Sequence, residues 1–323
     1  MACITNVPRT HKFGVSAAGD FGATEALVLS SQFRQISNSL NTAPVYSQDP
    51  GHTGTPFYDS AGVTLDSKAA TGSVQLQPRS DELATLLPLL GLENTEVADT
   101  WSPDPDGYCQ YFRASRFVDI TTFDFYDCKT SQWSIQSSKS SPRLTMDWGI
   151  EACSYETAGT WDLPTSTGFS QKQPFVHTSS VINIDGTIIP IDDLNISGNN
   201  NLTTDLYYNS VTRTALPAGR QEYQMTCTTP FNDEANDPYL TWFALEEASI
   251  SASLVFMADD DTSRLTITLP KIQGQINTPS TPSGETPVKM EGIVWTARAD
   301  LTDPENIVPP ISVKVEYGST PLT

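Results

Sequence analysis

Few residues in this chain have the types and spacing that catalysis or metal binding requires. The three histidines, His11, His52 and His177, lie in polar surroundings and share no metal-ligand spacing with a cysteine or an acid. An isolated histidine is much more often a surface or packing residue than a ligand. The sequence also contains no phosphate-binding glycine loop, nucleophile elbow or cysteine–histidine pair.

Three acidic stretches could in principle hold a cation or form a carboxylate pair. The first, Asp104-Pro-Asp-Gly107, faintly resembles the start of a calcium loop, but the later ligands and the bidentate glutamate are missing. Asp259–Asp261 is typical of a hairpin turn. Glu246-Glu247 could supply one carboxylate of a hydrolytic pair, but no second can be identified, and a helix end accounts for both. The sequence therefore predicts no catalytic residue, no cofactor, no metal site and no enzyme activity.

The chain is acidic throughout its length. Its 323 residues carry a formal net charge of -20, of which -9 falls in residues 1–164 and -11 in residues 165–323. Such a field repels nucleic acid, so base readout and phosphate clamping are not expected. It remains compatible with a role in which DNA passes without sticking.

Targeting and redox features are sparse. The N-terminus lacks a charged region followed by an apolar run, so no signal peptide is expected, and no window approaches the length of a transmembrane helix. The five cysteines are scattered and odd in number, which is typical of idle thiols in a reducing compartment. They are Cys3, Cys109, Cys128, Cys153 and Cys227.

Both halves of the chain show the same order of predicted elements. Each contains a strand, a single helix and a long β-hairpin, at Gly72–Leu90 and Phe123–Tyr155 in the first half and at Gly219–Glu247 and Arg264–Arg298 in the second. Ser80 is expected to cap the first helix. We interpret this order as a duplicated β-rich unit, with domains at residues 1–164 and 165–323. One large sandwich with coincidental spacing is the alternative.

The first hairpin runs through Phe123–Gln136, turns at Ser137–Pro142 and returns through Arg143–Ile150. Its alternation predicts that one face packs in the core and the other is polar. The residues expected in the core are Phe125, Trp133, Ile135, Leu144, Met146, Trp148 and Ile150.

The stretch 41–67 is rich in proline, glycine, aspartate and serine, and we expect a long loop there. Loops of this length usually carry function or contact a partner. The stretch also holds Tyr46, Phe57 and Tyr58, and aromatic residues commonly anchor interfaces. These three residues are therefore predicted to contact another subunit.

Four blocks of the sequence resemble the tail tube proteins of long-tailed bacteriophages, in the larger form of about this length. The blocks are Ala70–Leu83, Tyr126–Ile135, Phe175–Thr187 and Leu216–Arg220. Their order is more specific than any one of them, and the resemblance covers most of the chain from about residue 20. The motifs are structural rather than catalytic.

The resemblance implies a mainly β fold of tandem tail-tube sandwich or barrel domains, each with one flanking helix and a long hairpin. It implies that hairpins of neighbouring subunits join in one sheet lining a channel, and that rings stack with extended loops bridging them. The implied partners are the chain itself, the tape measure protein, and tail terminator and tip proteins. DNA would pass without sequence-specific binding. The protein would be assembled in the host cytoplasm and end in the virion tail, without membrane insertion.

Combined with the alternation, the resemblance gives candidate channel-lining residues. In the first hairpin they are Gln132, Ser134, Gln136, Asp147 and Glu151, and in the second Lys271, Gln273, Gln275, Lys289 and Glu291. About 24 strands, spaced ~4.8 Å apart and tilted ~45°, close a circle ~50 Å across, which a DNA duplex can enter. If each chain supplies two tube units, three chains complete such a ring. The rival arrangement is a hexamer with one tube fold per chain.

Two other readings stay open at this point. One is a tube component of a contractile tail or of a secretion system with the same fold. The other, from a different class, is a carbohydrate-binding or glycan-hydrolysing β-protein, favoured by the aromatic residues Trp101, Tyr108 and Tyr111 in loops.

Overall fold

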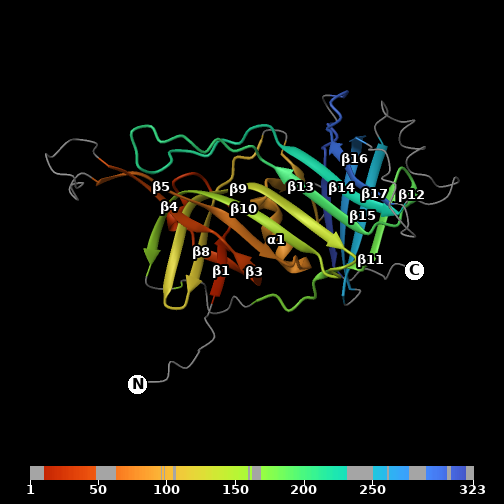
Figure 1. Cartoon of the computed structure of the whole chain (residues 1–323), viewed down its shortest axis with the longest axis horizontal. Helices are drawn as coiled ribbons and strands as arrows, with labels where there is room; N and C mark the ends of the chain where they lie inside the picture. Colours follow the sequence, from red (N-terminus) through yellow and green to blue (C-terminus); the bar gives the residue numbers. More distant parts are fainter. Residues whose placement is uncertain are drawn as a thin grey trace, which may run out of the picture.

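The computed structural model describes residues 11–48, 63–95, 97, 99–104, 107–158, 161, 169–230, 250–259, 262–275, 289–303 and 307–317. Within these ranges the chain is mainly β, as predicted, with antiparallel strand pairings and one α-helix (Figure 1). The second helix, expected at the end of Gly219–Glu247, lies outside them.

The first half contains ten of the described strands and the helix α1. They are β1 (His11–Ser16), β2 (Leu29–Phe33), β3 (Gln35–Asn38), β4 (Asn41–Gln48), β5 (Val63–Leu76), β6 (Leu92–Asn94), β7 (Thr100–Pro103), β8 (Phe112–Val118), β9 (Thr121–Ser138) and β10 (Thr145–Ala158), with α1 at Ser80–Leu89 and a short 3-10 turn at Thr24–Ala26.

The second half contributes eight strands among the described residues. They are β11 (Phe175–Ile184), β12 (Thr187–Ile188), β13 (Asp193–Asn199), β14 (Glu222–Pro230), β15 (Ile250–Ala258), β16 (Ser263–Gln275), β17 (Lys289–Ala297) and β18 (Ser312–Tyr317).

The long hairpin of the first half is formed by β9 and β10. Their antiparallel pairing runs from Thr145 opposite Gln136 to Ala158 opposite Thr122, with one irregularity at Gly149 and Ile150. All seven residues predicted to face the core are buried. The predicted hairpin and its register are therefore confirmed.

One continuous sheet, which we call the main sheet, runs through both halves of the chain. At one end β3 and β4 both pair with β5. From β5 the strand order continues through β10, β9, β13, β14 and β17 to β16. The two halves meet where β9 pairs with β13, with Ser138 opposite Asp193 and Gln132 opposite Asn199. The remaining strands continue from it through further pairings, such as β8 with β9 and β15 with β16. They include β18, which pairs with β7 of the first half.

Six strand pairings of the first half recur in the second. Strand β1 pairs with β2 and β8, as β11 pairs with β12 and β15. Strand β9 pairs with β8 and β10, as β16 pairs with β15 and β17. Strand β5 pairs with β10 and β4, as β14 pairs with β17 and β13. The matched strands also follow one another in the same order along the chain in both halves.

The joint between β9 and β13 depends on a glycine. Gly198 lies opposite Trp133, and a Cβ atom added to Gly198 would meet the indole at 2.5 Å. Gly198→Ala should therefore lower the free energy of unfolding by about 1–3 kcal/mol through overpacking. Denaturant titration measures this change. In a Trp133→Leu background the same substitution should cost much less, and an equal cost in both backgrounds would contradict the contact.

Two local predictions were wrong. The helix already begins at Ser80, Arg79 occupies the N-cap position, and no side chain caps the helix there. Ser80 is thus inside the helix and buried. The supposed loop 41–67 contains the paired strands β4 and β5, with Asn41 opposite Thr71 and Gln48 opposite Val63. Turn-forming residues in this stretch had obscured the alternation of the two strands.

Helix α1 holds a buried carboxyl group in its first turn. Burial raises the pKa of Glu82 to about 7, against the opposing charge of Arg79, and the Oε1 atom has no hydrogen-bond partner among the described residues. The folded protein then keeps a proton that the unfolded chain releases above about pH 4.5. Stability should therefore fall as pH rises from about 4.5 to 7.

Replacing this carboxyl by an amide removes the titration. Glu82→Gln should be more stable than the parent chain, and this difference in the free energy of unfolding should grow by about 1–3 kcal/mol from pH 5 to pH 8. Urea unfolding at the two pH values measures the gain. Exposed Glu25→Gln serves as the control and should change stability equally at both pH values. A gain that is the same at pH 5 and pH 8 for Glu82→Gln would refute the assignment.

Candidate functional site

The main sheet has one face made almost entirely of polar side chains. Strand register places a row of polar residues across seven neighbouring strands, each directly opposite the next. The row is Gln75, Asp147, Ser134, Ser197, Gln224, Thr296 and Gln273. The parallel row one position away on the core side is Val74, Trp148, Trp133, Gly198, Tyr223, Ala297 and Ile272. The sheet is therefore amphipathic across both halves.

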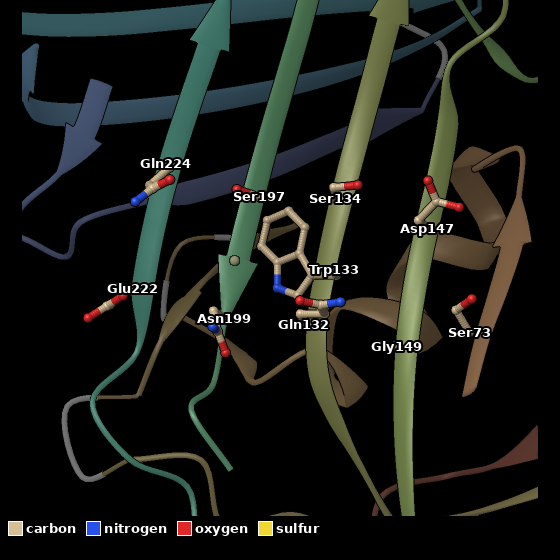
Figure 2. A pocket seen from close by; sticks show the side chains of 11 residues that line it. Ser73, Gln132, Trp133, Ser134, Asp147, Gly149, Ser197, Asn199, Glu222 and Gln224 are labelled. Atoms are coloured by element: carbon tan, nitrogen blue, oxygen red, sulfur yellow. The ribbon is translucent and has the colours of Figure 1, made fainter. Parts of the chain in front are cut away.

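A second polar row lies beside the first and borders a shallow hollow of about 380 Å³. This row consists of Ser73, Gly149, Gln132, Asn199 and Glu222. Figure 2 shows side chains of both rows around the hollow, with those of Asn199, Glu222 and Gln224 coming from the second half. The hollow is open and lined by amides, hydroxyls and two carboxylates, without a nucleophile and base placed together.

Most of these side chains are uncharged. Asp147 and Glu222 are the charged members of the two rows, and the Asp147 carboxylate accepts a hydrogen bond of 3.1 Å from the Gln136 amide. Such a surface has little positive charge with which to hold a phosphate backbone.

Glu151 lies at one side of this face and is partly covered. Its carboxylate accepts hydrogen bonds from Thr71 at 2.6 Å and from Arg213 at 2.7 Å. Arg213 belongs to the segment 200–221, which runs over the first half along the top of the view in Figure 1. The segment is tied to β5 by the hydrogen bond between the Lys68 N–H and the Val211 carbonyl.

The candidate residues of the second hairpin lie on β16 and β17. Gln273 belongs to the first polar row, and the Lys271 ammonium forms an ion pair with Asp300. Gln275 of β16 lies opposite Val294. The side chains of Gln275, Lys289 and Glu291 lie outside the described part of the chain.

The candidate contact residues are only partly described. Tyr46 lies on β4 and is exposed, next to Val45, and the paired strand β5 exposes Val63 and Leu65. These four are exposed apolar residues of a projecting hairpin, which we call the arm (Figure 1). Phe57 and Tyr58 lie outside the described residues.

Alternation along β13 and β14 is a further signal that sequence reasoning missed. Asn195, Ser197 and Asn199 alternate with Leu194 and Ile196, as the burial pattern of β13 confirms. The channel-lining residues predicted from the sequence lie in the two long hairpins. The same period-2 pattern in Asp193–Asn199 would have added these strands.

Other groups offer little chemistry. Ser137 Oγ and His177 Nδ1 are 2.6 Å apart, but Ser137 is buried. The described ranges bring together no group of three or more histidine, cysteine, aspartate or glutamate side chains that could hold a metal ion. No helix in the described part of the chain has the length and apolar composition that a membrane span requires.

The aromatic residues that favoured a carbohydrate-binding protein are not displayed on the surface. Trp101, Tyr108 and Tyr111 are all buried, and the Tyr108 hydroxyl donates a 2.7 Å hydrogen bond to the Leu89 carbonyl. Buried rings cannot stack on a sugar, so this support for the alternative is removed.

Comparison with known proteins agrees with the amphipathic sheet. A search of curated proteins returned no match. A family model described as phage tail tube protein matches residues 13–302, which covers both halves of the main sheet. The chain therefore belongs to the phage tail tube protein family.

Proposed function

We propose that copies of this chain assemble into stacked rings, and that the polar face of the main sheet lines the channel through which DNA is ejected. The observation that carries the proposal is the uninterrupted polar row from Gln75 to Gln273. A sheet with one polar and one core face, and with edges left for pairing, is suited to closure into a barrel shared between copies.

The proposed ring contains three chains, each contributing two tube-like domains at residues 1–164 and 165–323. The six recurring strand pairings support this duplication. Three chains would then give a ring with pseudo-sixfold shape. A hexamer with one channel-lining hairpin per chain is the rival.

The proposed lining includes Gln132, Ser134, Gln136, Asp147 and Gln273, together with the polar residues of β13 and β14. Its amides, hydroxyls and scattered carboxylates would let DNA move without being held. Glu151, Lys271, Gln275, Lys289 and Glu291 stay candidates for the same surface. The arm would contact the adjacent ring, and the tape measure, terminator and tip proteins would be further partners. The family is structural, and we propose no catalytic activity.

Electron microscopy of the purified protein tests the proposal. We expect rings or tubes whose end views show three chains around a channel of ~40 Å. Six identical chains per ring, each with one hairpin at the channel, would overturn the trimer. A monomer at every concentration tested would overturn self-assembly. Images of virions would show whether a sheath surrounds the tube, and a sheath would favour a contractile tail.

A further inference from the structure

The within-chain joint between β9 and β13 shows how two tube-like units of this protein fit together. In that joint Gln132 lies opposite Asn199, and Ser134 lies opposite Ser197. The Asn200 N–H donates to the Ser131 carbonyl at 2.9 Å, so Gln132 and Asn199 form a non-hydrogen-bonded pair. Their Cα atoms are therefore about 4.5 Å apart.

The recurring pairings allow each strand of this joint to be matched to one in the other half. Trp148 of β10 lies opposite Trp133 and Val74, and Trp295 of β17 lies opposite Gly274 and Met225. If the two tryptophans correspond, β9 corresponds to β16, and Gln132 corresponds to Gln273.

The same match assigns the other side of the joint. Glu222 of β14 corresponds to Thr71 of β5, and their partners are Asn199 and Asn41. The strand edge formed by β3 and β4 thus corresponds to β13. The residue types also agree, because Gln132 corresponds to Gln273 and Asn199 corresponds to Asn41. Ser197 likewise corresponds to Ser39, whose N–H donates to the Ser73 carbonyl.

Both corresponding edges lie at the ends of the main sheet. Among the described residues, β3 and β4 pair with β5 alone, and Gly274 of β16 pairs with Trp295 alone. The Ser39 hydrogen bond points toward β5, so the N–H and carbonyl of Leu40 point away from it. Leu40 is buried, and these two groups are bonded within the chain, the N–H to the Asn38 side chain and the carbonyl to the Arg116 guanidinium, so a further strand would have to replace both partners.

We propose that Ser39–Asn41 of one copy pairs antiparallel with Gln273–Gln275 of a second copy, with Asn41 opposite Gln273. The proposal rests on the proposed ring and names the contact that closes it. The facing residues carry no charge, so no like charges oppose the pairing. Each chain would then be joined to the next by the same geometry that joins its own two halves.

Disulfide trapping tests this register. Asn41→Cys and Gln273→Cys are introduced together in a Cys3→Ser, Cys109→Ser background, and assembled particles are oxidised. Directly opposite cysteines in a non-hydrogen-bonded pair fall within disulfide reach. We expect most chains to become linked to other chains, with a ladder on non-reducing gels that stops at the trimer.

Two matched variants control the result. Gln132→Cys with Asn199→Cys, the corresponding within-chain pair, should link while the chain keeps the mass of a monomer. Ser39→Cys with Gln273→Cys is displaced by two residues and should link at least tenfold more slowly, because diagonal neighbours are about 7–8 Å apart. Particles that form normally while Asn41→Cys, Gln273→Cys stays unlinked and the within-chain pair links would overturn this joint but not the ring. Failure of the parent protein to form rings would overturn both.

Discussion

Trp148→Ala should lower the free energy of unfolding by about 3–5 kcal/mol, the range measured for large core residues. Trp148 is fully buried, and its ring centroid lies 5.9 Å from that of Phe13 and 5.4 Å from that of Phe112. Its indole N–H donates a 2.7 Å hydrogen bond to the Thr130 hydroxyl, which in turn donates to the Leu89 carbonyl at the end of α1. The substitution removes a large apolar volume and the link between β10 and the helix.

Chemical denaturation monitored by circular dichroism measures the loss. Gln132→Ala on the opposite face of the adjacent strand is the control, because surface substitutions usually change stability by about 0.5 kcal/mol or less. If Trp148→Ala and Gln132→Ala cost the same, the core does not lie on the Trp148 face of the sheet.

Removing the apolar surface of the arm should abolish tubes and leave rings. Val45, Tyr46, Val63 and Leu65 are 54%, 61%, 47% and 37% exposed, so the isolated chain gains little from them. Apolar and aromatic residues at the centre of an interface commonly carry most of its binding energy. Changing all four to threonine keeps the β propensity of the strands while removing the surface that would be buried between rings.

Tube length in electron micrographs measures this effect, and thermal unfolding checks that the chain still folds. Ile120→Thr is the matched control, because Ile120 is an apolar residue 85% exposed at the turn between β8 and β9 and does not belong to the arm. The control should form tubes of normal length. Tubes of normal length from the fourfold variant would remove the arm from the ring-to-ring contact.

The hairpin of β9 and β10 could be predicted because its alternation is long and is fixed by large side chains. A slip of one residue would expose Trp133 and Trp148 and bury Gln132 and Asp147, so the buried face determines the register.

Long-range pairing could not be predicted in the same way. No local pattern tells which strand β9 will meet beyond β10, and its partner β13 comes after a further hairpin. The arm was missed because Pro44 and the turn residues after Gln48 resemble a loop. Pro44 is tolerated because it lies on a strand that is paired, among the described residues, on one side only.

The backbone groups of Leu40 that point away from β5 are already occupied within the chain. The Leu40 N–H donates to the Asn38 side chain at 2.9 Å, and the Arg116 guanidinium donates to the Leu40 carbonyl at 2.7 Å. An occupied edge is a poor template for stray strands, which protects a newly made chain from amyloid-like stacking. If Leu40 pairs with a second copy as proposed, both side chains must first withdraw, which would place an activation barrier before polymerisation. Assembly should therefore begin with a lag that a preformed end removes.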